Sequence, residues 1–127
     1  MMAASAATAV RLLLVEDDPD ARDTIARALR KHGFHVDVAE SAGAALVRLE
    51  VAPKPSAAVI DLRLPDGNGG IVLWRIRREY GRTVPVAVVT GLPDPLSRPE
   101  LVREQPDVIF PKPLNLKGIV AWLKSVT

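Results

Sequence analysis

The chain contains no cysteine, which excludes disulfide bonds, thiolate metal sites and a cysteine nucleophile. The absence of cysteine fits a reducing compartment, so we expect a cytoplasmic protein. An excess of charge of one sign is also missing. Seventeen basic against fifteen acidic side chains leave a net charge of +2, which is too small to predict direct nucleic-acid binding. Apolar runs are far shorter than the ~20 residues of a membrane span, so we expect no membrane partner.

The residues that are present are sufficient for one folded domain. The chain has 127 residues, of which 48% are hydrophobic and 25% charged, as is ordinary for a globular protein with a core. Residues 1–9 are rich in alanine but lack the basic start and apolar stretch of a signal peptide. We therefore expect a flexible tail over residues 1–9 and a single domain over residues 10–127.

Apolar runs and helical stripes alternate along the chain. Five apolar runs predict short strands, at residues 11–15, 34–39, 57–61, 84–90 and 107–110. Four amphipathic stripes predict helices between or after them, with capping residues Asp18, Ser41 and Asn115 at three starts and Gly33 and Gly81 at two ends. Prolines at 93, 95 and 99 forbid a long regular helix after the fourth strand. We expect an irregular fourth helix there, with one short turn-rich helix near residues 98–104.

Strict alternation of strands and helices predicts a parallel sheet with helices on both faces. The fold class is therefore α/β, a doubly wound five-stranded sheet with strand order 2-1-3-4-5. In that order strands 1, 3, 4 and 5 are consecutive neighbours, so their carboxyl ends meet at one shallow cleft.

Polar residues stand at the ends of four predicted strands: Glu16 and Asp17, Asp61, Thr90 and Lys112. Carboxylates so close together raise one another's pKa or need a counter-ion, and a site of oxygen donors with open positions favours Mg²⁺. Asp61 can then act as a nucleophile towards a phosphoryl group. Mg²⁺ and Lys112 would neutralise the charge of that group, and the Thr90 hydroxyl can donate to it.

These residues resemble the response-regulator receiver domain, the CheY-like, flavodoxin-type phosphoacceptor module of two-component signalling. The resemblance covers residues 11–126. It rests on four motifs in order, Val15-Glu16-Asp17-Asp18, Asp61-Leu62-Arg63-Leu64-Pro65 with Asn68-Gly69, Val88-Val89-Thr90-Gly91 and Lys112-Pro113. The spacings of 44 residues from Asp17 to Asp61, 29 to Thr90 and 22 to Lys112 suit this family.

The resemblance implies a role for each matching residue. It makes Asp61 the phosphoacceptor and Asp17 the direct Mg²⁺ ligand, with Glu16 acting through water and Arg63 through its backbone carbonyl. It makes Thr90 the hydroxyl that moves onto the phosphoryl group and Lys112 its ionic partner, with a cis bond before Pro113. Arg63 and Leu92 should border the phosphoryl group.

The resemblance also implies a function. A histidine kinase or phosphotransfer protein would donate the phosphoryl group, and the protein would catalyse its own phosphorylation and slow dephosphorylation without being a metabolic enzyme. The switched surface would act on a downstream effector or a fused output domain, in a monomer or a weak phosphorylation-dependent dimer. The alternative is a pseudo-receiver that is never phosphorylated and only binds proteins. An aspartate phosphatase is disfavoured by Arg63, and a flavodoxin by the acidic residues after the first strand.

Several further residues are not assigned to the predicted phosphoacceptor site. The family often carries an aromatic residue three before the lysine, where this chain has Ile109, with Phe110 on the opposite side of the strand. His32 and His35 are predicted to be surface residues. The arginines of the third helix are predicted to form a solvated face: Arg75, Arg77, Arg78 and Arg82. Trp74 and Trp122 fit either partner contacts or local packing.

Overall fold

The computed structural model describes residues 10–91 and 104–127. Five parallel strands form the central sheet, in the order β2-β1-β3-β6-β7. Their bounds are β1 Arg11–Val15, β2 His35–Ala39, β3 Ala57–Asp61, β6 Val86–Thr90 and β7 Val108–Pro111. Counted along the chain this is the predicted order 2-1-3-4-5, so the doubly wound α/β fold is confirmed.

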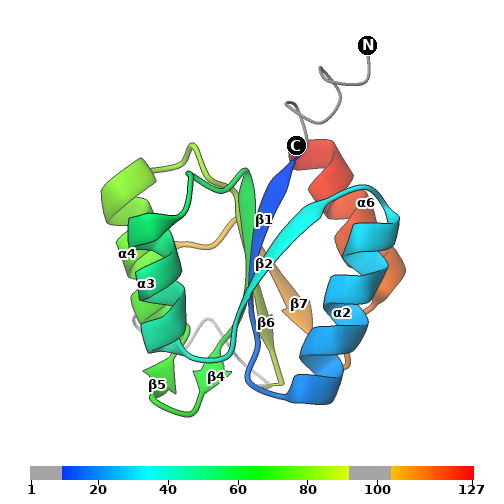
Figure 1. Cartoon of the computed structure of the whole chain (residues 1–127), viewed down its shortest axis with the longest axis horizontal. Coiled ribbons are helices and arrows are strands. Elements are labelled where there is room, and N and C mark those ends of the chain that lie inside the picture. Colours follow the sequence, from blue (N-terminus) through cyan, green and yellow to red (C-terminus); the bar gives the residue numbers. More distant parts are fainter. Residues whose placement is uncertain (1–9, 92–103) are drawn as a thin grey trace.

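Helices cover both faces of the sheet (Figure 1). Helices α2, Pro19–Lys31, and α6, Leu116–Val126, lie on one face, and α3, Ala42–Val51, and α4, Gly70–Tyr80, on the other. The three predicted N-caps are confirmed, because the side chains of Asp18, Ser41 and Asn115 each accept a bond from the N–H three residues on. Gly33 lies just beyond the end of α2 and Gly81 follows α4, with φ of 90° and 60°.

The core is divided by the sheet into two layers. Under α3 and α4 it is built around Ile60, Leu73 and Ile76, and under α2 and α6 around Leu14, Leu29 and Leu123. All five residues of β3 are buried, as the continuous apolar run predicted. Asp61 is the last of them, at 2% exposure, and therefore ends a strand that is enclosed on both sides.

A two-stranded hairpin follows β3 and was not predicted. Strands β4, Arg63–Leu64, and β5, Gly67–Asn68, pair antiparallel around the Pro65-Asp66 turn. Both carboxylate oxygens of Asp66 accept backbone bonds of 2.9 Å, from the N–H groups of Ala42 and Gly43 at the start of α3. The hairpin is thus fastened to a helix that precedes it by 24 residues.

The prediction of a solvated arginine face on α4 is wrong for Arg77. Its side chain is only 8% exposed. Its guanidinium donates to the carbonyls of Gly81, Val84, Glu104 and Gln105 and to the carboxylate of Asp107. Arg82 also donates to Gln105. Both guanidinium groups therefore bind backbone carbonyl groups at the end of α4 and in the loops that follow it.

The two tryptophans and the two histidines singled out in the sequence make local contacts or are exposed. Trp74 is 44% exposed with the Arg78 guanidinium 5.1 Å from its ring centroid, and Trp122 meets Phe110 edge-on at 6.4 Å. Phe110 packs into the core layer of α2 and α6. His32 and His35 are exposed, as predicted.

Three expectations fall outside the described residues. These are the tail over residues 1–9, the irregular helix near residues 98–104 and the position of Leu92. Among the residues that are described, none of the helices has the length and apolar character needed to cross a bilayer.

Candidate functional site

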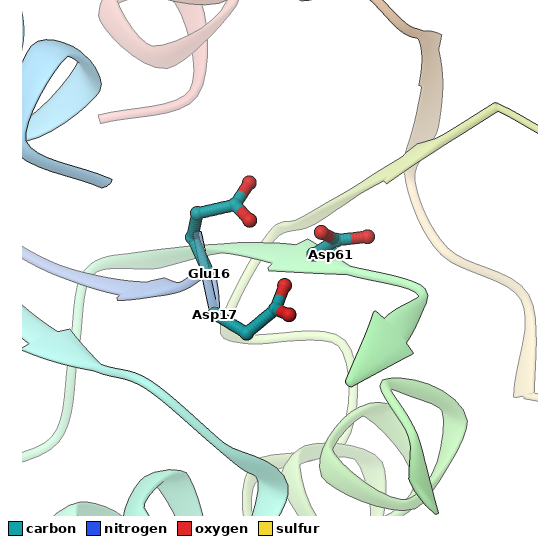
Figure 2. A group of neighbouring side chains, drawn as sticks. All are labelled: Glu16, Asp17 and Asp61. Atoms are coloured by element: carbon teal, nitrogen blue, oxygen red, sulfur yellow. The ribbon is translucent and has the colours of Figure 1, made fainter. Parts of the chain in front are cut away.

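The carboxyl ends of β1 and β3 bring three acidic side chains together. Glu16 and Asp17 follow β1 directly, and Asp61 ends the neighbouring strand β3. One carboxylate oxygen from each lies within 4.8 Å of the other two. Figure 2 shows the three side chains turned towards the same space. Glu16 and Asp61 are buried and Asp17 is exposed, so the cluster opens to solvent on the Asp17 side.

Lys112 supplies the opposite charge. Its Nζ lies 2.8 Å from Oδ2 of Asp61. The lysine reaches this position because it follows edge strand β7, and its backbone N–H donates to the carbonyl of Thr90 on β6. Burial disfavours the charged form of Lys112, but the hydrogen bond and charge of Asp61, with the charges of Glu16 and Asp17, outweigh it and raise the pKa of the ammonium group. The predicted cis bond between Lys112 and Pro113 is present.

Glu16 is the acid that the cluster perturbs most clearly. Burial and, to a lesser degree, the charge and hydrogen bond of Asp61 together raise the pKa of Glu16 to about 7, against the lowering effects of the Asp18 N–H and of Lys112. The Asp18 N–H donates to Glu16 Oε2 at 3.1 Å. Glu16 is therefore readily protonated near neutral pH, because burial and the neighbouring Asp61 disfavour a further negative charge in the cluster.

The second oxygen of Asp61 is held by the hairpin. The backbone N–H of Arg63 donates to Oδ1 of Asp61 at 3.1 Å, while the Arg63 side chain is exposed. Gly69, which follows the hairpin, lies against the backbone of the same aspartate. A Cβ at this position would overlap the Asp61 carbonyl oxygen and stand 2.6 Å from Cγ2 of Ile60. Both carboxylate oxygens and the backbone of Asp61 are thus fixed by named neighbours.

Thr90 ends the strand beside Asp61. In the β3–β6 register Asp61 pairs with Val89, so Thr90 stands one residue further along β6. It is 3% exposed, and its backbone carbonyl is the acceptor for Lys112. The sheet therefore carries Asp61, Thr90 and Lys112 on three consecutive strand ends, as the strand order predicted.

A cavity of about 500 Å³ adjoins the acidic cluster. Glu16 and Lys112 form part of its wall, and the rest is mainly apolar: Ala21, Ile25, Val89, Pro113 and Leu114, with Asp18. The cavity gives the cluster a partly apolar approach from the side of α2.

Arg22 is a neighbour of the site that the sequence did not single out. Its guanidinium donates to the backbone carbonyls of Glu16 at 3.1 Å and Asp17 at 3.2 Å. These two bonds tie the acidic loop to the first turn of α2. The position of Arg22, about one helical turn after the capping Asp18, is the one sequence feature that bears on this contact. Its partners are backbone carbonyl groups, which every residue has, so the sequence alone does not identify them.

Comparison with known proteins agrees with this geometry. The family model described as the response regulator receiver domain matches residues 12–124. The photosynthetic apparatus regulatory protein RegA of Rhodobacter capsulatus is 42% identical over 103 residues, covering 69% of this chain and 54% of that protein. The transcriptional regulatory protein SphR of Synechococcus elongatus is 32% identical over 130 residues, covering 96% and 50%. The chain spans about half the length of these two relatives.

Solved structures give the same fold. A CheY-like receiver domain from Methylobacillus flagellatus superposes with a TM-score of 0.81 at 26% identity, over 94% of this chain and all (100%) of that one. A second, from Methanospirillum hungatei JF-1, gives a TM-score of 0.84 at 24% identity over 93% of both chains. With the family model matched over nearly all of its length, this chain belongs to the response regulator receiver domains of two-component signalling.

Proposed function

We propose that Asp61 accepts a phosphoryl group from a phosphohistidine of a histidine kinase or phosphotransfer protein, in a reaction that requires Mg²⁺. The observation that carries the proposal is the 2.8 Å ion pair between Lys112 Nζ and Asp61 Oδ2 beside two further carboxylates. One lysine does not neutralise three acids, and phosphoryl transfer requires that charge be neutralised around the reacting oxygens.

The donor set fits a magnesium ion. Glu16, Asp17 and Asp61 offer carboxylate oxygens within 4.8 Å of one another, and such hard oxygen ligands suit Mg²⁺. Asp17 is exposed, which leaves room for the waters that Mg²⁺ keeps. In this proposal Asp17 and Asp61 are ligands, Glu16 contributes through water and the backbone carbonyl of Arg63 completes the protein ligands. The bound ion would supply neutralisation of the phosphoryl oxygens.

The chain's own residues perform the remaining steps. A carboxylate oxygen of Asp61 attacks phosphorus, the P–N bond to the donor histidine breaks, and its electron pair leaves with the imidazole, which takes up a proton. Lys112 transfers its ionic contact from Asp61 to a phosphoryl oxygen, and the Thr90 hydroxyl donates to another. Attack by water on phosphorus later releases inorganic phosphate and restores Asp61, so the protein catalyses its own slow dephosphorylation.

The product of this chemistry is a changed surface, and not a released metabolite. The bound phosphoryl group favours one population of conformations over another, and a downstream effector or a fused output domain reads the difference. We place this exchange in the cytoplasm, with the protein as a monomer or a weak phosphorylation-dependent dimer.

The test is labelling with acetyl phosphate. With MgCl₂, intact-mass spectrometry should find one added phosphoryl group per chain, and EDTA or Asp61→Asn should abolish it. Asp66→Asn is the matched control, because Asp66 lies in the hairpin after β3 and is bonded to α3, so it should be labelled as the wild type is. A folded protein that stays unlabelled with every small donor and with a panel of phosphorylated kinases would instead support the pseudo-receiver.

A further inference from the structure

A groove between α2 and α6 lies apart from the acidic cluster and shares none of its residues. Its volume is about 330 Å³. Its lining is mainly apolar, from Ala28 on α2 and from Leu116, Val120 and Ala121 on α6. The two helices lie side by side on the same face of the sheet (Figure 1). This volume is at the low end for small-molecule sites and suits one or two large side chains from a partner.

The rim of the groove is basic. His32, Lys117 and Lys124 complete the lining, and no acidic residue belongs to it. Within residues 10–91 and 104–127, neither lysine has an ion-pair partner.

The neighbouring acids do not compensate this charge. Helix α6 contains no aspartate or glutamate. On α2 the acids Asp20 and Asp23 lie in the first half of the helix, and Asp23 is paired with Arg27 at 2.9 Å. The two lysines are spaced by seven residues, or about two turns of α6, so they flank the apolar floor along the groove's length.

From this combination we infer that the α2–α6 groove is a docking site for an acidic amphipathic helix of a partner protein. An apolar stripe of that helix would seat on Ala28, Val120 and Ala121, and its flanking carboxylates would pair with Lys117 and Lys124. Grooves between helices bind amphipathic helices through apolar anchors at positions i, i+3 or i+4 and i+7. Complementary charges at the rim give specificity and speed association, while the apolar floor supplies affinity.

The probe is a set of three helical peptides that share one leucine stripe and differ only in the flanking residues, which are all Glu, all Gln or all Lys. Each is titrated into the ¹⁵N-labelled protein. The Glu peptide should shift the amide signals of Ala28, Val120 and Ala121 and bind tightest, and the Lys peptide weakest. In Lys117→Glu/Lys124→Glu the order should reverse, with the Glu peptide weakened roughly fivefold to tenfold.

Two further variants test the location. Lys54→Glu/Arg78→Glu changes the net charge by the same amount away from the groove, and it should leave the order of the peptides unchanged. Ala121→Gln extends a side chain over the groove floor from an exposed helical position and should weaken all three peptides.

Three results would overturn the inference. The first is an absence of amide shifts at the groove. The second is an order of peptide affinities that stays the same in Lys117→Glu/Lys124→Glu. The third is sedimentation showing that the groove joins two copies of this chain. All of these measurements are made without phosphorylation, so failure of the phosphoryl-acceptor proposal would leave them unaffected.

Discussion

Arg77 and Asp107 form an ion pair of 2.8 Å that joins helix α4 to the start of edge strand β7. The same Oδ2 atom of Asp107 accepts the backbone N–H of Val86 at 2.7 Å, where β6 begins. Since Arg77 also binds four backbone carbonyls, one guanidinium group connects a helix, two loops and the entrances of two strands. This cluster stands on the sheet's far end from Asp61, so it supports the fold and not the chemistry.

Arg77→Gln is therefore expected to destabilise the protein. It leaves several carbonyl groups without this donor and the Asp107 carboxylate without its ion-pair partner, at a cost of about 2–3 kcal/mol in the free energy of unfolding. Urea denaturation measures the change. The matched control is Arg78→Gln, one residue along, where the loss of an exposed cation–π contact with Trp74 should cost about 1 kcal/mol or less. Equal changes in the free energy of unfolding for the two substitutions would show that the contacts of Arg77 add no stability beyond that of an exposed arginine.

Gly69→Ala is expected to disturb the backbone of the phosphoacceptor. The added Cβ would collide with the Asp61 carbonyl oxygen and with Ile60, and the chain must move at a cost of about 1–3 kcal/mol. Gly118→Ala in α6 is the control, because its nearest neighbours are at 3.6 Å and alanine favours helix. Denaturation should separate the two, and amide shifts of Asp61 should change in the first variant alone. A Gly69→Ala protein of wild-type stability would contradict the close approach.

Asp66 gives the protein a pH-dependent contribution to stability. The N–H groups of Gly43 and Ala42 hold the pKa of Asp66 below its usual 3.8. A depressed pKa means that the contribution is fully present above the unfolded value of 3.8 and is lost as the pH falls through the lower folded value. Asp66→Asn should thus lower stability at neutral pH, and the gap to the wild type should narrow in acid. Urea midpoints measured across this pH range check the prediction. A difference in stability between variant and wild type that does not change with pH would be inconsistent with a role for the ionised Asp66 carboxylate.

Sequence patterns predicted the local features of this fold well. The strand ending in Asp61 and the caps Asp18, Ser41 and Asn115 depend on residues within one helical turn or one strand, and all are present. The convergence of Glu16, Asp17 and Lys112 on Asp61 followed from strand order, because neighbouring parallel strands end at the same edge.

Contacts across long separations were not predictable in the same way. Arg77 reads as a surface arginine in sequence, since its partners are backbone carbonyls up to 28 residues away, which carry no sequence signal. Asp66 reads as a turn residue, and nothing local indicates that it binds the start of α3. The raised pKa of Glu16 likewise arises from burial, which only the packed structure defines.

Asp17→Asn tests the electrostatics of the acidic cluster. Without Mg²⁺, removing one of three carboxylates within 4.8 Å relieves repulsion, so the variant should be at least as stable as the wild type. With Mg²⁺, the wild type should melt at a higher temperature, because an ion that binds only the folded state stabilises it, and the variant should lose most of this gain.

Thermal melts in MgCl₂ and in NaCl of equal ionic strength separate binding from screening. The control is Asp18→Asn, one residue along, because Asp18 caps α2 through Ala21 and asparagine caps nearly as well. It should keep the full response to Mg²⁺. If Asp17→Asn kept the full response as well, the ion would have to bind elsewhere, and the charge balance proposed around Asp61 would need another source.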